Sequence, residues 1–186
     1  MSPEVERTLA EAYGEPHRAY HTAAHIAEVL RWFDVVADEA GWDDPLAAYQ
    51  AILFHDVVYD ATRGDNEARS AEIAARVGGA GARACELILL TAKHGSLEAV
   101  ADRDTAHFLD ADTAILGAPP ADFDAYDAAI RVEYRHVPDD LYRAGRGAFL
   151  AKMRARPRIF FSELFHARLD ARARENLDRA IARLRG

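Results

Sequence analysis

Residues 45–58, PLAAYQAILFHDVV, decide how the fold is interpreted, because they are almost entirely apolar until His55 and Asp56. Pro45 suits the first turn of a helix, where a missing backbone N–H does no harm. A helix that is apolar on all sides belongs in the interior of a protein. Since an ionised carboxylate is costly to bury alone, we expect His55 and Asp56 either to end the helix in water or to share a cation.

The sequence on both sides of this stretch is also helical in pattern. His21–Glu39 places apolar residues on one face and charges on the other. We expect Asp65 to cap the next helix and Gly95 to end the one after it. Strand-like alternation is scarce, which predicts an all-α, irregular helical bundle in a single domain, 1–186. Its core is expected over 18–117 and its C-terminal helices over 119–185, with helices at 66–77, 85–93, 108–116, 120–134, 139–155 and 169–185.

Composition excludes several classes of protein. Half of the 186 residues are apolar, which is incompatible with a disordered chain. A net charge of −8 argues against a nucleic-acid polymer as partner, since such binding needs a basic face. There is no apolar run long enough to cross a membrane and no secretory signal, so we expect a cytoplasmic protein. The single cysteine, Cys85, is expected to be a buried apolar residue.

Other ionisable residues interrupt apolar helical segments. His25 lies at the edge of the apolar face of its helix, and Asp110 and Asp112 lie within FLDADTAILG. Each has an ordinary explanation: a helix end for the His55–Asp56 pair, a core-edge histidine bonded to backbone for His25, and solvated carboxylates for the two aspartates. A shared metal ion is the alternative that accounts for all of them, because neutral imidazole and carboxylate both bind divalent cations.

The order of these residues resembles the HD superfamily of metal-dependent phosphohydrolases, in particular a bacterial group of short stand-alone domains whose substrate is unassigned. The resemblance implies the HD-type helical fold and one divalent metal ion held by His25, His55, Asp56 and Asp112. It leaves Asp110 as a neighbour of these ligands or a ligand of a second metal. The matching segments span residues 20–177: YHTAAHIAEVL, AILFHDVVYD, DNEARSA, FLDADTAILG, IRVEY and ARENL.

Further candidates surround the expected ligands. HD phosphohydrolases place a catalytic carboxylate shortly after the HD pair, which makes Asp60 and Glu67 the candidates here. His21 lies one helical turn before His25, and a protonated His94 at a helix C-terminus could bind phosphate. The residues expected to bind substrate are His21, Asn66, Lys93, His94 and Arg131, with Arg146 as a weaker candidate. The ordinary explanation for each of them is a surface or helix-end residue.

The resemblance implies hydrolysis of a phosphate ester, with nucleotides as one candidate class, by water that a metal activates. The ligand types do not select among Mn, Mg, Co, Ni, Fe and Zn. Two alternatives remain open: a two-metal HD protein such as a di-iron oxygenase, using His94 and His107, and a non-catalytic HD ligand-binding module. The expected partner is a small phosphorylated substrate. The apolar residues of the C-terminal helix could pack internally or form a homodimer.

Overall fold

A computed structural model describes residues 1–97, 99–100 and 102–185 of the chain. Within these residues the protein is all-helical and contains no strand, so the predicted all-α class is confirmed. The helices are α1 (Pro3–Tyr13), α2 (Ala23–Glu39), α3 (Pro45–Phe54), α4 (Asn66–Gly78), α5 (Ala82–Thr91), α6 (Arg103–Asp112), α7 (Pro120–Glu133), α8 (Asp139–Arg154) and α9 (Glu163–Arg185), with short 3₁₀ turns η1 (His94–Ser96) and η2 (Ala114–Gly117).

Several boundaries differ from those expected. Helix α1 was not predicted, although Ser2 caps it by accepting a hydrogen bond from the Val5 N–H. Helix α3 ends at Phe54, four residues early, so His55 and Asp56 lie in the turn that follows it. Helix α6 begins at Arg103 and α9 at Glu163, both earlier than expected. The predictions succeeded where apolar periodicity is strong and failed at polar helix starts.

One of the two predicted helix-end residues was wrong. Asp65 holds the N-cap position of α4, as predicted, but its carboxylate binds the Arg63 guanidinium and makes no capping hydrogen bond. Gly95 does not end α5, which already stops at Thr91, and it lies within η1. Gly79, by contrast, adopts the left-handed conformation that ends α4, with a φ of 62°.

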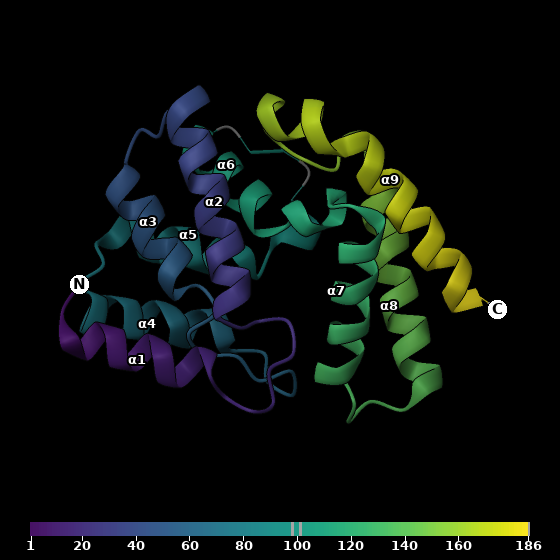
Figure 1. Cartoon of the computed structure of the whole chain (residues 1–186), viewed down its shortest axis with the longest axis horizontal. Coiled ribbons are helices and arrows are strands. Elements are labelled where there is room, and N and C mark those ends of the chain that lie inside the picture. The colour runs from purple at the N-terminus through teal and green to yellow at the C-terminus, as the bar shows by residue number, and fades with distance from the viewer. Residues whose placement is uncertain (98, 101, 186) are drawn as a thin grey trace.

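Helix α3 occupies the centre of the fold. It packs against α2, α4, α5 and α6, and its residues Ala48, Ile52 and Phe54 are fully or almost fully buried. In Figure 1, α1 to α5 gather on one side of the molecule and α7 to α9 lie together on the other. Both sides belong to one continuous apolar core and a single domain. The turn after α3 therefore emerges in the middle of the protein, where other helices converge.

Helix α9 packs against η2 and α8, so its apolar residues are used within the chain. Leu177 is fully buried, and Ile181 and Leu184 pack on the core. None of the helices in the described residues combines the length and apolar character that a membrane span requires.

The contact between η2 and α9 depends on Gly117. A Cβ atom at this position would lie 2.6 Å from Leu169 Cβ and 2.9 Å from the Leu169 carbonyl oxygen. We expect Gly117→Ala to lower the free energy of unfolding by about 1–3 kcal/mol, because backbone must move to admit the methyl group. Gly145→Ala is the control, since a Cβ there meets nothing within 4 Å and should stabilise α8 by up to about 1 kcal/mol. Urea denaturation of both variants measures the difference, and equal stability would contradict the close approach.

Candidate metal centre

Four ionisable side chains meet at the centre of the protein. His25 comes from the first turns of α2, His55 and Asp56 from the turn after α3, and Asp112 from the last residue of α6. One potential ligand atom from each lies within 4.8 Å of all the others. This is the only group of this kind in the part of the chain that the structure describes, and it is the set expected from the sequence.

The two imidazoles face each other. His25 Nε2 lies 3.2 Å from His55 Nε2 and 3.1 Å from Asp112 Oδ1, and His55 Nε2 lies 3.1 Å from Asp56 Oδ2. The His55 Nδ1–H donates to the Ile52 carbonyl at 2.9 Å, which directs the Nε2 lone pair of the neutral ring toward the centre. Two nitrogen lone pairs at this separation repel, so a proton or a metal ion must lie between them and the carboxylates.

Electrostatics in the centre favour charge separation. Burial alone lowers the pKa of His55, but the Asp56 and Asp112 carboxylates outweigh it and hold that pKa well above its usual range. Burial raises the pKa of Asp112, but His55 and His25 outweigh it and hold that pKa well below its usual range. Burial raises the pKa of Asp56 as well, but His55 and His21 outweigh it and hold that pKa well below its usual range. Both carboxylates are therefore ionised and can serve as ligands. Two imidazole nitrogens and two carboxylate oxygens fit a divalent transition-metal ion or Mg²⁺.

The turn that carries His55 and Asp56 is held by a buried arginine. The Arg18 guanidinium donates to the Asp56 carbonyl at 2.6 Å and to the Val57 carbonyl at 3.2 Å, and it also binds the His21 carbonyl. Its side chain has no exposed surface. Arg18 thereby fixes the turn relative to the segment before α2. Sequence reasoning missed this residue, because nothing in its local pattern separates it from the many surface arginines.

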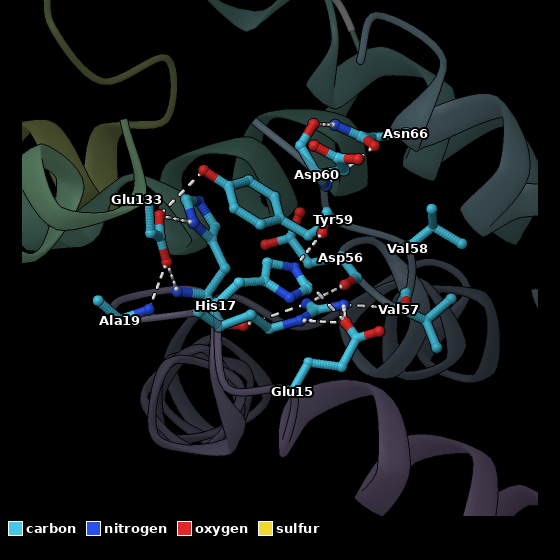
Figure 2. Close-up of polar contacts among 12 residues, drawn as sticks. Glu15, His17, Ala19, Asp56, Val57, Val58, Tyr59, Asp60, Asn66 and Glu133 are labelled. Carbon is cyan, nitrogen blue, oxygen red and sulfur yellow. Dashed lines mark hydrogen bonds and ion pairs between the residues drawn. The ribbon is translucent and has the colours of Figure 1, made fainter. Parts of the chain in front are cut away.

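Glu133, at the end of α7, organises the segment that precedes α2. Its Oε1 accepts hydrogen bonds from the N–H groups of Ala19, Tyr20 and His21, at 2.7–3.0 Å. Its Oε2 accepts from His21 Nδ1 at 2.7 Å and from the Tyr59 hydroxyl at 2.9 Å. Figure 2 shows Glu133 reaching Ala19 on one side and Tyr59 on the other. Burial raises the pKa of Glu133, but the hydrogen bonds from His21 and the backbone outweigh this effect and lower the pKa to about 2.

The pair formed by Glu133 and His21 sets the orientation of the imidazole. Because His21 Nδ1 is hydrogen-bonded to Glu133, Nε2 is the ring nitrogen that can interact with a molecule from solution. The His21 ring stacks on Tyr59, with centroids 4.0 Å apart. His21 was expected near the ligands, whereas Glu133 was not among the expected site residues. The signal that could have identified Glu133 is a carboxylate on the apolar side of a helix.

A polar cleft of about 400 Å³ opens onto the two carboxylate ligands. Asp56 and Asp112 line it, together with His21, Glu67 and Asn66 from the predicted set. It also contains Arg63, which was not predicted and whose guanidinium binds Asp65 in a bidentate ion pair. A larger cavity of about 740 Å³ is also lined by His25, but neither Asp56 nor Asp112 lines it.

The structure separates the two carboxylates proposed for catalysis. Glu67 lies in the first turn of α4 and lines the cleft. Asp60 does not line it, because its Oδ1 accepts hydrogen bonds from the Thr62 N–H and hydroxyl, and its backbone N–H and carbonyl bind the Asn66 side chain. Figure 2 shows Asp60 beside Asn66. Asp60 thus shapes the loop before α4, and Glu67 is the carboxylate available to the cleft.

Asp110 does not face the four ligands. It is fully buried, and its oxygens accept hydrogen bonds from the Phe161 N–H at 2.8 Å and from the Ser162 N–H and hydroxyl at 2.7 Å. Burial raises the pKa of Asp110 to about 7, against the opposing effect of these donors. The predicted place of Asp110 beside the ligands is corrected accordingly: it anchors the segment before α9.

Four further predicted contacts also fall outside the cleft. His94 is buried, and burial lowers its pKa to about 4, so it is neutral and not the cation expected to bind phosphate. Lys93 is exposed and does not line the cleft. Arg131 is occupied by the carbonyls of Tyr134 and Val137 and by the Asp139 carboxylate. His107, the other histidine of the two-metal alternative, packs against Trp42 and Phe165.

Comparisons with protein-family models, with curated proteins and with solved structures give no match for this chain. Its class therefore rests on what the molecule itself shows. The chain is an all-helical protein with a group of two histidines and two aspartates that could hold a metal ion.

The two aspartates of α6 should have separable roles. We expect Asp112→Asn to weaken Mn²⁺ binding by at least about 100-fold, because it removes a charged ligand, while the metal-free protein stays folded. Asp110→Asn should retain metal binding but lower the free energy of unfolding by about 2 kcal/mol, because an amide NH₂ would face N–H and O–H donors. Calorimetric titration and urea denaturation distinguish the two. Reversed phenotypes would overturn the assignment of Asp112 as the ligand.

The contribution of Glu133 to stability should depend on pH. Its pKa is about 2 in the folded protein, against about 4.5 when unfolded, so its ionisation adds up to about 3 kcal/mol above pH 4.5. This contribution is lost as the pH falls from 4.5 toward 2. We expect the stability difference between wild type and Glu133→Gln to be largest at pH 7 and clearly smaller at pH 3. Urea unfolding at both pH values measures it. A difference that does not change with pH would mean that the charge of Glu133 is irrelevant to folding.

Proposed function

We propose that this chain is a metal-dependent phosphohydrolase of the HD type that cleaves a phosphate ester with water. One observation carries the proposal. Two imidazoles and two carboxylates from three separate helical segments meet at one point, and the two carboxylates face a polar cleft that also holds an arginine, a glutamate and an oriented histidine. A divalent ion bound there supplies activated water and polarises a phosphoryl oxygen.

The cleft provides the remaining groups that such a reaction needs. Arg63 offers a planar guanidinium to phosphate oxygens, and phosphate would compete with Asp65 for it. Glu67 takes the proton that the attacking water releases. His21 faces the same cleft and donates a proton from Nε2 to the leaving oxygen, while the ionised Glu133 holds its Nδ1–H. Glu133 acts through His21 and is a positioning residue.

The two alternatives draw less support. A two-metal protein needs a second set of ligands, yet the described residues hold a single four-residue group, and His107 packs between aromatic rings away from it. A non-catalytic module would not need a proton donor and a carboxylate beside the metal site. His21, Arg63 and Glu67 line the cleft beside the two carboxylate ligands.

Hydrolysis assays on paired substrates test the proposal. The purified protein is assayed with p-nitrophenyl phosphate and with glycerol phosphate, supplying Mn²⁺, Mg²⁺, Co²⁺ or Ni²⁺ in turn. We expect hydrolysis with at least one ion and its loss in Asp56→Asn. We expect His21→Ala to lower kcat on glycerol phosphate by about 100-fold or more, because an alkoxide needs a proton to leave. The same variant should retain most of the activity on p-nitrophenyl phosphate, whose phenolate leaves without one.

Controls separate failure of chemistry from failure of folding. Circular dichroism and Mn²⁺ titration are recorded for each variant, so that a loss of activity is interpreted only where fold and metal binding persist. Metal binding without hydrolysis of any phosphate ester would favour the non-catalytic module. Equal losses of His21→Ala on both substrates would remove the proton-donor role of His21 and leave the hydrolase assignment standing.

A further inference from the structure

A second cavity of about 490 Å³ adjoins the polar cleft. The two spaces share His21, Tyr59 and Tyr134 as lining residues, so they meet at the stacked pair of His21 and Tyr59. The second cavity extends from there between α7 and α8. Its remaining lining residues are Tyr126, Ile130, Val137, Leu141, Tyr142, Gly145, Arg146 and Phe149.

The lining of this second cavity is aromatic and carries no free charge among the described residues. Its one charged side chain, Arg146, is bound by Nε and Nη2 to Asp127 Oδ1, at 3.1 and 2.9 Å. The flat guanidinium also lies over the rings of Tyr126 and Phe149, 5.2 and 5.5 Å from their centroids. Arg146 is therefore neutralised and stacked, and it does not offer the unpaired charge that a phosphate group would require.

The rim of the cavity exposes large apolar side chains. Leu141 is 60% and Phe149 40% exposed, although both lie at a cavity rather than on a convex surface. Concave, mostly apolar spaces of roughly 300–1,000 Å³ with a few polar groups are typical of small-molecule sites. Aromatic rings bind other rings by stacked or edge-to-face contact, which aliphatic or strongly hydrated groups do not satisfy.

We propose that this aromatic pocket binds a flat, uncharged ring in the alcohol part of the substrate, while the phosphate lies in the polar cleft. The inference rests on the proposed function for the phosphate end, and it adds the chemical class of the leaving group: an aryl or ring-bearing phosphate ester rather than a small aliphatic one. The His21 and Tyr59 pair lies where the two parts of such a substrate join, at the bond that would be cleaved.

Gly145 allows the pocket to be filled without disturbing the fold. It lies within α8 and lines the pocket, and a Cβ atom there meets nothing within 4 Å. Gly145→Leu therefore adds an isobutyl group at a position that lines the pocket and has open space around its Cβ atom. The matched control is Ala148→Leu, an exposed residue of the same helix that lines neither space.

Binding of non-hydrolysable probes tests the pocket independently of catalysis. Phenylphosphonate and methylphosphonate are titrated calorimetrically into the whole 186-residue chain loaded with Mn²⁺. We expect phenylphosphonate to bind wild type at least tenfold more tightly than methylphosphonate. Gly145→Leu should remove this preference and leave methylphosphonate affinity unchanged, and Ala148→Leu should preserve it.

The outcomes distinguish the pocket from the proposed function. A phenyl preference that depends on Gly145, without hydrolysis of any ester, keeps the pocket and removes the phosphohydrolase. Equal affinity of the two probes, no binding of either, or no effect of Gly145→Leu overturns the pocket. Light scattering is recorded in parallel to measure the oligomeric state. If the wild type is a dimer that Gly145→Leu dissociates, and it shows no preference for phenylphosphonate, this face is a subunit interface. That result would overturn the ring-binding pocket as well.

Discussion

The close approach of four ionisable side chains at the centre is the constraint on which the structure depends. Two facing imidazole nitrogens and two carboxylates would be unstable in an apolar interior if each were considered alone. Together they are tolerable, because opposite charges compensate one another and the four ligand atoms lie close enough to share a cation. The centre requires α2, α6 and the turn after α3 to be held at fixed positions, since a ligand set is useful only when its geometry is rigid.

Two buried charged residues outside the ligand set supply that rigidity. Arg18 binds the carbonyls of the turn that carries His55 and Asp56, and Glu133 binds the backbone just before α2. Both act on main-chain groups, which have no other partner in a turn or at a helix start. Since Glu133 belongs to α7, the second half of the chain is tied directly to the segment that positions His21 and His25. The candidate metal centre is thus a product of the whole domain.

The same end of α7 connects the polar and aromatic spaces. Glu133 orients His21 and receives the Tyr59 hydroxyl, and the next residue, Tyr134, lines both spaces. The segment before α2, the turn and loop after α3, and helices α4 and α6 supply the charged groups around the cleft, whereas α7 and α8 supply most of the aromatic wall. In the proposed reaction this arrangement separates recognition of the alcohol from chemistry at phosphorus.

The sequence by itself determined the helical class, the central position of residues 45–54 and the identity of the four clustered residues. The helical class and the central helix follow from apolar periodicity, and the candidate ligands follow from the polar residues that interrupt it. Both are local properties of the sequence. The choice of Asp112 over Asp110 came from the family resemblance. The sequence could not separate Asp60 from Glu67, or tell that Asp110 anchors a backbone segment and that Arg131 binds α7's own C-terminal end. The partners of Asp110 lie 51 and 52 residues away, whereas those of Asp60 and Arg131 lie in adjacent turns, whose conformation helical periodicity does not specify. The roles of Arg18 and Glu133 could not be predicted from the sequence either. Most of their partners are backbone groups, which are chemically alike at every residue. Only the tertiary structure decides which of these groups come within hydrogen-bond distance.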